Sequence, residues 1–291
     1  MFTVSLIAAP ARANLESALV DGLARGWDGS GLRWLNPGIA AEFDVAAQPA
    51  DLDRVWADLQ RVGIDLAIQP AQGRRKMLLL ADMDSTMIQQ ECIDELADMA
   101  GVGARVADIT ARAMNGELNF NDALIERVGL LAGLDESVIA EVLKTRITLA
   151  PGGLELVATM RANGAYAALV SGGFTSFTGP VASMLGFDEN RANTLLARDG
   201  KLTGDVGRPI LGREAKIEAL QGITATRGIT VDQAIAVGDG ANDLGMLQLA
   251  GAGVALHAKP AVAAQAGIRI NHGDLTALLY LQGYRAADFA A

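Results

Sequence analysis

The chain has 291 residues, of which 51% are apolar, so it can bury more than one core. Its formal net charge of −10 argues against a protein that binds nucleic acid. Apolar runs such as KMLLLA are too short to span a bilayer, so no membrane partner is expected. The single cysteine excludes an intramolecular disulfide and favours a reducing compartment, so we expect a cytoplasmic protein.

The first 70 or so residues predict a unit of their own. TVSLIAA and IDLAIQP are typical of strands, and LRWLNPGIAAEFDVA is typical of a hairpin around Asn36-Pro37-Gly38. ANLESALVDGLARG and PADLDRVWADLQRVG have the spacing of amphipathic helices. The resulting order, βαββαβ, is ferredoxin-like. We predict an N-terminal domain over residues 1–74, with PAQGRR at 70–75 as a linker.

After the linker, strands and helices alternate. A strand over 76–82 precedes a helical stretch from about 88 to 147, which PGG at 151–153 ends. A helix over 153–163, the strands AYAALVS, QAIAVGDG and AGVAL, and a short hairpin at TLLARDGKLTGDV follow. Apolar strands alternating with helices predict an α/β fold with a doubly wound, Rossmann-type parallel sheet. We expect it over residues 75–291, with an inserted helical cap at about 88–150.

Three predicted strands end in polar, glycine-rich sequence: DMDST, SGGF and GDGAND. Because ligands bind beyond the carboxyl ends of parallel strands, we expect these ends to meet. Asp82 and Asp84 should lie side by side and raise each other's pKa. Together with Asp239 and Asp243 they would need a cation, and hard oxygen ligands in small number suggest Mg²⁺. Ser171 with Gly172 and Gly173 predicts a phosphate cradle at a helix start, and Lys216 could add a positive charge.

These motifs, in this order, resemble those of the haloacid dehalogenase-like hydrolases. The signature D-x-D-x-T is present as Asp82-Met83-Asp84-Ser85-Thr86, and the others are Ser171, Lys216 and GDGAND. The resemblance implies that Asp82 is the nucleophile and that Asp84 is the general acid and base. It implies Mg²⁺ held by Asp82, the backbone carbonyl of Asp84 and Asp239, with Asp243 behind them. Ser171, Gly172, Gly173, Lys216 and Asn242 would bind the phosphate. Met83, usually Phe in the family, should face into packing.

Within the cap, RAMNGELNFNDALIERVGLL resembles the phosphoserine phosphatases. The resemblance implies that Glu91 binds a substrate ammonium, Arg127 a carboxylate, and that Met114 and Phe120 close over the substrate. It implies Mg²⁺-dependent hydrolysis of O-phospho-L-serine, a small-molecule substrate, through an aspartyl-phosphate. The N-terminal unit resembles amino-acid-binding ACT-type modules, but its first turn, AAPARAN, has no glycine, so we assign it no ligand.

Other interpretations stay open at this point. The chain could hydrolyse another small phosphomonoester, transfer the phosphoryl group to an acceptor amino acid, or be an amino-acid-binding regulator. Asp82 and Asp84 could cap a helix, Glu91 and Arg127 could be solvated charges, and Met114 and Phe120 could be core residues. Cys92 is expected to be a buried apolar residue. We assign no role to His257 or His272, and the oligomeric state, a homodimer included, is left open.

Overall fold

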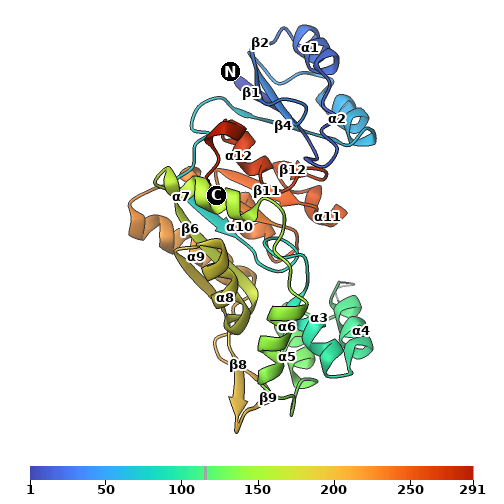
Figure 1. The fold of residues 1–291 in the computed structure, drawn as a ribbon, viewed down its shortest axis with the longest axis vertical. Helices are drawn as coiled ribbons and strands as arrows, with labels where there is room; N and C mark the ends of the chain where they lie inside the picture. Colours follow the sequence, from blue (N-terminus) through green and yellow to red (C-terminus); the bar gives the residue numbers. More distant parts are fainter. Residues whose placement is uncertain (115–116, 291) are drawn as a thin grey trace.

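The first 70 residues fold into a four-stranded antiparallel sheet with two helices. The computed structural model describes residues 1–114 and 117–290 of the chain. The strand order is β2-β3-β1-β4, and the predicted βαββαβ sequence of elements is confirmed (Figure 1). The strands are β1 (Phe2–Ala8), β2 (Ser30–Asn36), β3 (Ala40–Val45) and β4 (Ile64–Pro70), and the helices are α1 (Ser17–Gly26) and α2 (Leu52–Arg61).

The two faces of this sheet pack against different partners. Side chains alternate across a strand, so Val4 and Leu6 of β1 pack beneath α1 and α2, whereas Ile7 joins the core formed by the rest of the chain. Asp65 of β4 is fully buried, and its carboxylate accepts hydrogen bonds of 2.8–3.0 Å from the backbone N–H groups of residues 271–273. A buried carboxylate and apolar contacts therefore dock the sheet on the rest of the chain.

Two arginines hold the segment 70–75, which the sequence predicts as a linker. Arg74 forms a buried ion pair with Glu42 of β3 and donates a hydrogen bond of 2.9 Å to the carbonyl of Leu281. The guanidinium of Arg75 lies 3.3 Å from the centre of the Tyr284 ring. The segment is thus tied both to the N-terminal sheet and to the C-terminal end of the chain. The division into domains at residue 74 stays a prediction.

The rest of the chain is built on a six-stranded sheet in the order β12-β11-β10-β5-β6-β7. All neighbouring pairs are parallel, which confirms the predicted α/β fold. The sequence does not predict β7 or β12, because ENRAN is polar and IRI is only three residues long. The strands are β5 (Leu78–Ala81), β6 (Tyr166–Phe174), β7 (Glu189–Asn193), β10 (Ala234–Gly238), β11 (Ala252–Leu256) and β12 (Ile268–Ile270).

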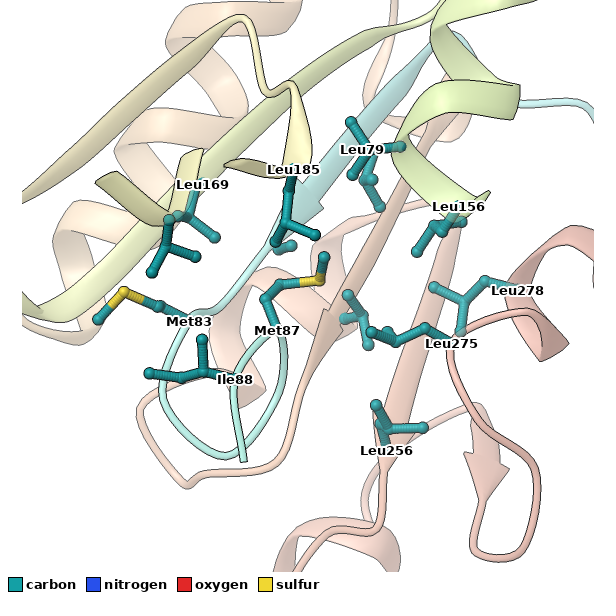
Figure 2. Packing of buried hydrophobic residues seen from close by; sticks show 14 of the residues in the cluster. Leu79, Met83, Met87, Ile88, Leu156, Leu169, Leu185, Leu256, Leu275 and Leu278 are labelled. Atoms are coloured by element: carbon teal, nitrogen blue, oxygen red, sulfur yellow. The ribbon is translucent and has the colours of Figure 1, made fainter. Parts of the chain in front are cut away.

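Helices cover both faces of this sheet. Leu78 and Leu80 of β5 pack with α9 and α10, whereas Leu79 packs with α7, α8 and α12 on the other face. Figure 2 shows Leu79 and Met83 in one apolar cluster, and the burial of Met83 confirms that it faces into packing. The helices are α7 (Gly153–Ala162), α8 (Thr175–Leu185), α9 (Arg213–Arg227), α10 (Leu244–Leu249), α11 (Pro260–Ala263) and α12 (Ala277–Leu281), with 3₁₀ turns at Val231–Gln233 and Ala286–Asp288.

A group of four helices, called the cap below, is inserted between β5 and α7 (Figure 1). The chain enters and leaves it through adjacent segments that form a bridge between Ile88 and Leu149. The hairpin of β8 (Leu195–Arg198) and β9 (Lys201–Val206) reaches the cap, where the N–H of Gly133 donates to the carbonyl of Leu202 at 2.8 Å. The cap helices are α3 (Cys92–Met99), α4 (Gly103–Met114), α5 (Phe120–Gly129) and α6 (Ser137–Thr145).

Candidate active site

Three adjacent strands bring polar residues to one edge of the parallel sheet. β5 lies between β10 and β6. Asp82 follows β5, Asp239 follows β10, and Ser171 lies where β6 leaves its regular pairing with β7. The strand ends therefore meet as the sequence predicts, because the carboxyl ends of parallel strands share an edge.

Lys216 reaches this edge from α9 and contacts two carboxylates. Its ammonium nitrogen lies 2.5 Å from an oxygen of Asp82 and 2.5 Å from an oxygen of Asp243, and its side chain is 1% exposed. Burial alone would lower the pKa of Lys216, but the charges of Asp243 and Asp82 outweigh burial and raise that pKa. Lys216 is thus a fixed positive charge at neutral pH.

Asp82, Asp239 and Asp243 form an acidic cluster around this lysine. One carboxylate oxygen from each lies within 4.8 Å of the other two. Burial, followed by repulsion from Asp243, raises the pKa of Asp82 and raises the pKa of Asp239 to about 6. Three carboxylates against one ammonium leave an excess of negative charge in a buried place, and a divalent cation would neutralise it.

Hydrogen bonds distinguish Asp243 from the other two carboxylates. One oxygen of Asp243 accepts from Lys216, and the other accepts from the backbone N–H of Gly240 at 2.9 Å. Asp239 accepts a hydrogen bond of 3.3 Å from the Thr86 hydroxyl. With both oxygens engaged, Asp243 is suited to orienting Lys216, whereas Asp82 and Asp239 are better placed to hold a cation.

Asp84 has a different environment. Its Oδ1 accepts a hydrogen bond of 3.1 Å from the backbone N–H of Cys92, at the start of α3. Burial, followed by repulsion from Glu91, raises the pKa of Asp84 to about 7. The sequence predicts that Asp82 and Asp84 raise each other's pKa. The charge that most raises the pKa of Asp82 is instead that of Asp243, so this prediction is wrong about the main charge. The strand ends at Ala81, so strand alternation no longer places the two side chains together.

Residues 171–173, called the phosphate loop below after the role predicted for them, form a bulge in β6. The pairing with β7 joins Val170 to Arg191 and resumes only between Phe174 and Asn193, so β6 contains two more residues than β7 in this stretch. The extra residues interrupt the regular pairing of β6 with β7. The predicted helix start lies just beyond, since α8 begins at Thr175.

Close neighbours leave no room for a Cβ atom at the two glycines of the phosphate loop. A Cβ atom on Gly172 would lie 2.8 Å from the ring of Phe120, and one on Gly173 would lie 2.7 Å from Oδ2 of Asp84. The Ser171 hydroxyl accepts a hydrogen bond of 2.8 Å from the N–H of Gly173. The loop therefore brings a hydroxyl and peptide groups close to both Asp84 and the cap.

Glu91 and Arg127 approach the site from the cap. Glu91 precedes α3 and accepts a hydrogen bond of 2.7 Å from the Ser85 hydroxyl. Half-buried Arg127 of α5 donates to the carbonyl of Ala123 at 3.2 Å and to the Thr110 hydroxyl at 3.5 Å. Burial lowers the pKa of Arg127, although the nearby acidic groups oppose it. Among the described residues, no carboxylate lies within 4.0 Å of this guanidinium.

Phe120 and Asn242 also lie beside the phosphate loop. Phe120 begins α5, and its ring faces Gly172 and Gly212 of the core. The amide nitrogen of Asn242 lies 3.6 Å from the position a Cβ would take on Gly172. Met114 ends α4, and its side chain lies outside the described residues, so the role predicted for it stays a prediction.

Two polar residues near the site were not assigned a role from the sequence. Thr86 is buried, and its hydroxyl donates a hydrogen bond to Asp239. Its place at the end of the D-x-D-x-T signature is the sequence signal that points to it. Asp94, in the first turn of α3, is the carboxylate that most opposes the lowering of the pKa of Arg127. Acidic residues are common in the first turn of a helix, so no sequence signal singles out Asp94.

Known proteins are similar to this chain over most of its length. A family model described as haloacid dehalogenase-like hydrolase matches residues 79–248. The chain is 41% identical over 259 residues to a phosphoserine phosphatase of Streptomyces coelicolor, covering 88% of this chain and 63% of that protein. It is 36% identical over 298 residues to phosphoserine phosphatase SerB2 of Mycobacterium tuberculosis, covering 99% of this chain and 73% of that protein.

The fold is similar to that of a solved structure over nearly its whole length. The crystal structure of a HAD-family hydrolase from Salmonella enterica serovar Typhi has a TM-score of 0.87 and 29% sequence identity, and the match covers 96% of this chain and 97% of that one. The chain spans less than two thirds of the length of the Streptomyces relative. Within the described residues, no helix is both long and apolar enough to cross a membrane.

Proposed function

The chain belongs to the haloacid dehalogenase-like hydrolase family, and we propose that it is a Mg²⁺-dependent phosphoserine phosphatase. It would hydrolyse O-phospho-L-serine to L-serine and phosphate, the last step of L-serine biosynthesis. The relatives that carry this name support the proposal over most of the chain. The charges around the phosphate loop supply independent support.

The observation that carries the proposal is the half-buried Arg127 guanidinium, which has no ion-pair partner among the described residues. A guanidinium suits a carboxylate in a bidentate geometry, and Glu91 would bind an ammonium group nearby. On the core side, the phosphate loop, Lys216 and Asn242 would bind a phosphate. An acid, a base and a phosphate site together are complementary to a small zwitterion that carries a phosphate. Phe120 and Met114 would close over it.

Asp82, Asp239 and the backbone carbonyl of Asp84 would hold Mg²⁺. The excess negative charge of the acidic cluster supports this choice. Asp243, which accepts a hydrogen bond from Lys216, would hold that side chain in place. When bound, Mg²⁺ would neutralise negative charge on the phosphate oxygens and on the nucleophile.

In the first step, a carboxylate oxygen of Asp82 would attack phosphorus as the bond to the serine oxygen breaks. Asp84 would donate its proton to that oxygen, and L-serine would leave. Asp84 would then take a proton from a water molecule, whose oxygen attacks phosphorus and displaces Asp82. The pKa of Asp84, about 7, supports a group that exchanges a proton in this way near neutral pH. Lys216 would hold Asp82 and a phosphate oxygen in line.

The test is phosphate release from a panel of phosphomonoesters, with Mg²⁺ and with EDTA. Phosphoserine should be among the best substrates by kcat/KM, and EDTA should abolish turnover. Preference for a phosphomonoester without a carboxylate or an ammonium group would overturn the substrate assignment. A phosphorylated acceptor amino acid formed without phosphate release would indicate transfer instead of hydrolysis.

A further inference from the structure

Asn193, the last residue of β7, lies outside all the motifs described above but contacts two parts of the site. Its side chain is buried, with 2% exposure. The amide nitrogen donates to the carbonyls of Gly172 at 2.8 Å and Leu211 at 3.1 Å, and the amide oxygen accepts from the N–H of Leu211 at 2.7 Å. Two acceptors on one side and a donor on the other fix which way the amide points.

The first of these partners belongs to the phosphate loop. Because residues 171–173 bulge out of β6, their peptide groups leave the regular ladder with β7. A backbone carbonyl shielded from water needs a hydrogen-bond partner, and Asn193 supplies one to the partly buried Gly172. The side chain of Asn193 thereby takes the place of the missing ladder bond and holds the bulge in shape.

The second partner leads directly to Lys216. Leu211 is followed by Gly212, the residue before α9, and Lys216 lies in the first turns of that helix. Residues 207–212 form neither helix nor strand, so contacts such as those of Asn193 determine where α9 begins. The position of that helix end in turn determines where the ammonium group of Lys216 lies between Asp82 and Asp243.

We propose that Asn193 is a positioning residue that fixes the phosphate loop relative to Lys216. It acts through the backbone of Gly172 and Leu211 and does not touch the phosphate. The proposal rests on the proposed function in one respect only, namely that both segments bind the same phosphate group. Because phosphoryl transfer depends on positioning, a displacement of about 1 Å costs on the order of 100-fold in rate.

Two variants and one control separate this role from a purely structural one. Asn193→Ala removes all three bonds. Asn193→Asp keeps the size and the acceptor for Leu211 but replaces the donor with a second oxygen that faces two carbonyls. The control is Thr178→Val. It removes a buried hydroxyl that donates a hydrogen bond of 2.8 Å to the side chain of Asn190 in β7, and it leaves the contacts of the phosphate loop unchanged.

The experiment measures the binding of orthovanadate and of L-serine by isothermal titration calorimetry with Mg²⁺, the kcat for phosphoserine and the unfolding temperature. Both Asn193 variants should bind orthovanadate about 10-fold or more weakly and lose about 100-fold in kcat, with L-serine binding unchanged. Thr178→Val should lower only the unfolding temperature.

Unchanged orthovanadate binding in a folded Asn193 variant would overturn the positioning role. Equal losses of orthovanadate and L-serine binding, or the absence of cooperative unfolding in both variants, would also overturn it, since Asn193 would then serve the fold. Failure of the wild type to hydrolyse phosphoserine would refute the proposed substrate, and orthovanadate binding would still decide the role of Asn193.

Discussion

The core and the cap hold their charged groups in different ways. In the core, Lys216 is buried and lies 2.5 Å from both Asp82 and Asp243. In the cap, Arg127 is only half-buried and makes hydrogen bonds of 3.2 and 3.5 Å to neutral groups. The groups proposed for phosphoryl transfer are thus arranged before substrate binds, whereas a group proposed for selectivity still lacks a charged partner. Four variants test this difference.

The largest effect is expected from Asp82→Asn, which removes the proposed nucleophile. Turnover should fall by about 10³-fold or more, and no phosphoprotein should form, because an amide cannot replace the attacking carboxylate. Phosphate release and labelling with radioactive phosphoserine measure the two losses. The control is Asp188→Asn, at the opposite end of the strands, which should keep kcat. Turnover that survives in Asp82→Asn would refute the assignment of Asp82 as the nucleophile.

Arg127→Ala should act on binding more than on chemistry. Loss of the proposed, partly buried partner of the substrate carboxylate should cost about 2–3 kcal/mol in kcat/KM for phosphoserine. A phosphomonoester without a carboxylate should show no such loss. Arg112→Ala removes a partly exposed cap arginine paired with Glu126 and should leave kcat/KM for both substrates unchanged. Equal losses for the two substrates in Arg127→Ala would contradict the proposed contact.

Asp239→Asn should stabilise the metal-free protein. The pKa of Asp239 is raised from 3.8 to about 6, so keeping this carboxylate ionised in the folded protein costs on the order of 1–3 kcal/mol above pH 6. The cost is absent below about pH 4, where the group is protonated in both states, and it grows as the pH rises to 6. With EDTA at pH 7.5, the variant should unfold about 2–6 °C above wild type.

The same variant should lose its response to Mg²⁺. Wild type should unfold at a higher temperature when Mg²⁺ is added, because a ligand that binds only the folded state stabilises it. Asp239→Asn should show little or no shift. A metal-free variant less stable than wild type at pH 7.5 would contradict the cost of ionising Asp239. An unchanged Mg²⁺ shift would show that Asp239 is not a metal ligand.

Phe120→Ala should have the smallest effect. The substitution removes the ring that lies beside Gly172 and Gly212. The lost apolar contacts are worth about 1 kcal/mol, so kcat/KM should fall by roughly 5-fold. The loss should be similar for all phosphomonoesters, because Phe120 would close the site and not recognise the amino acid. Phe187→Ala, which alters the same core away from the site, should lower the unfolding temperature without changing kcat/KM. A loss confined to phosphoserine would contradict a simple lid.

Local patterns made much of the fold and the site predictable. Apolar runs such as KMLLLA and the motifs at their ends determine where Asp82, Asp239 and Lys216 lie. Other features depend on contacts distant in the chain. The polar strand β7 is formed by pairing with β6, and the bulge of the phosphate loop is held by Asn193, twenty-one residues beyond Gly172. The effect of Glu91 on the pKa of Asp84 likewise depends on where the cap lies.

The carboxylate of Asp65 has a consequence for any attempt to study the parallel sheet and the cap without the N-terminal sheet. A fragment that begins after residue 74 would leave three backbone N–H groups, at residues 271–273, without their acceptor. Each such loss costs about 1–3 kcal/mol where water cannot enter. In the intact chain, these amides should exchange slowly with deuterium, so their exchange rate reports whether the N-terminal sheet stays docked during turnover.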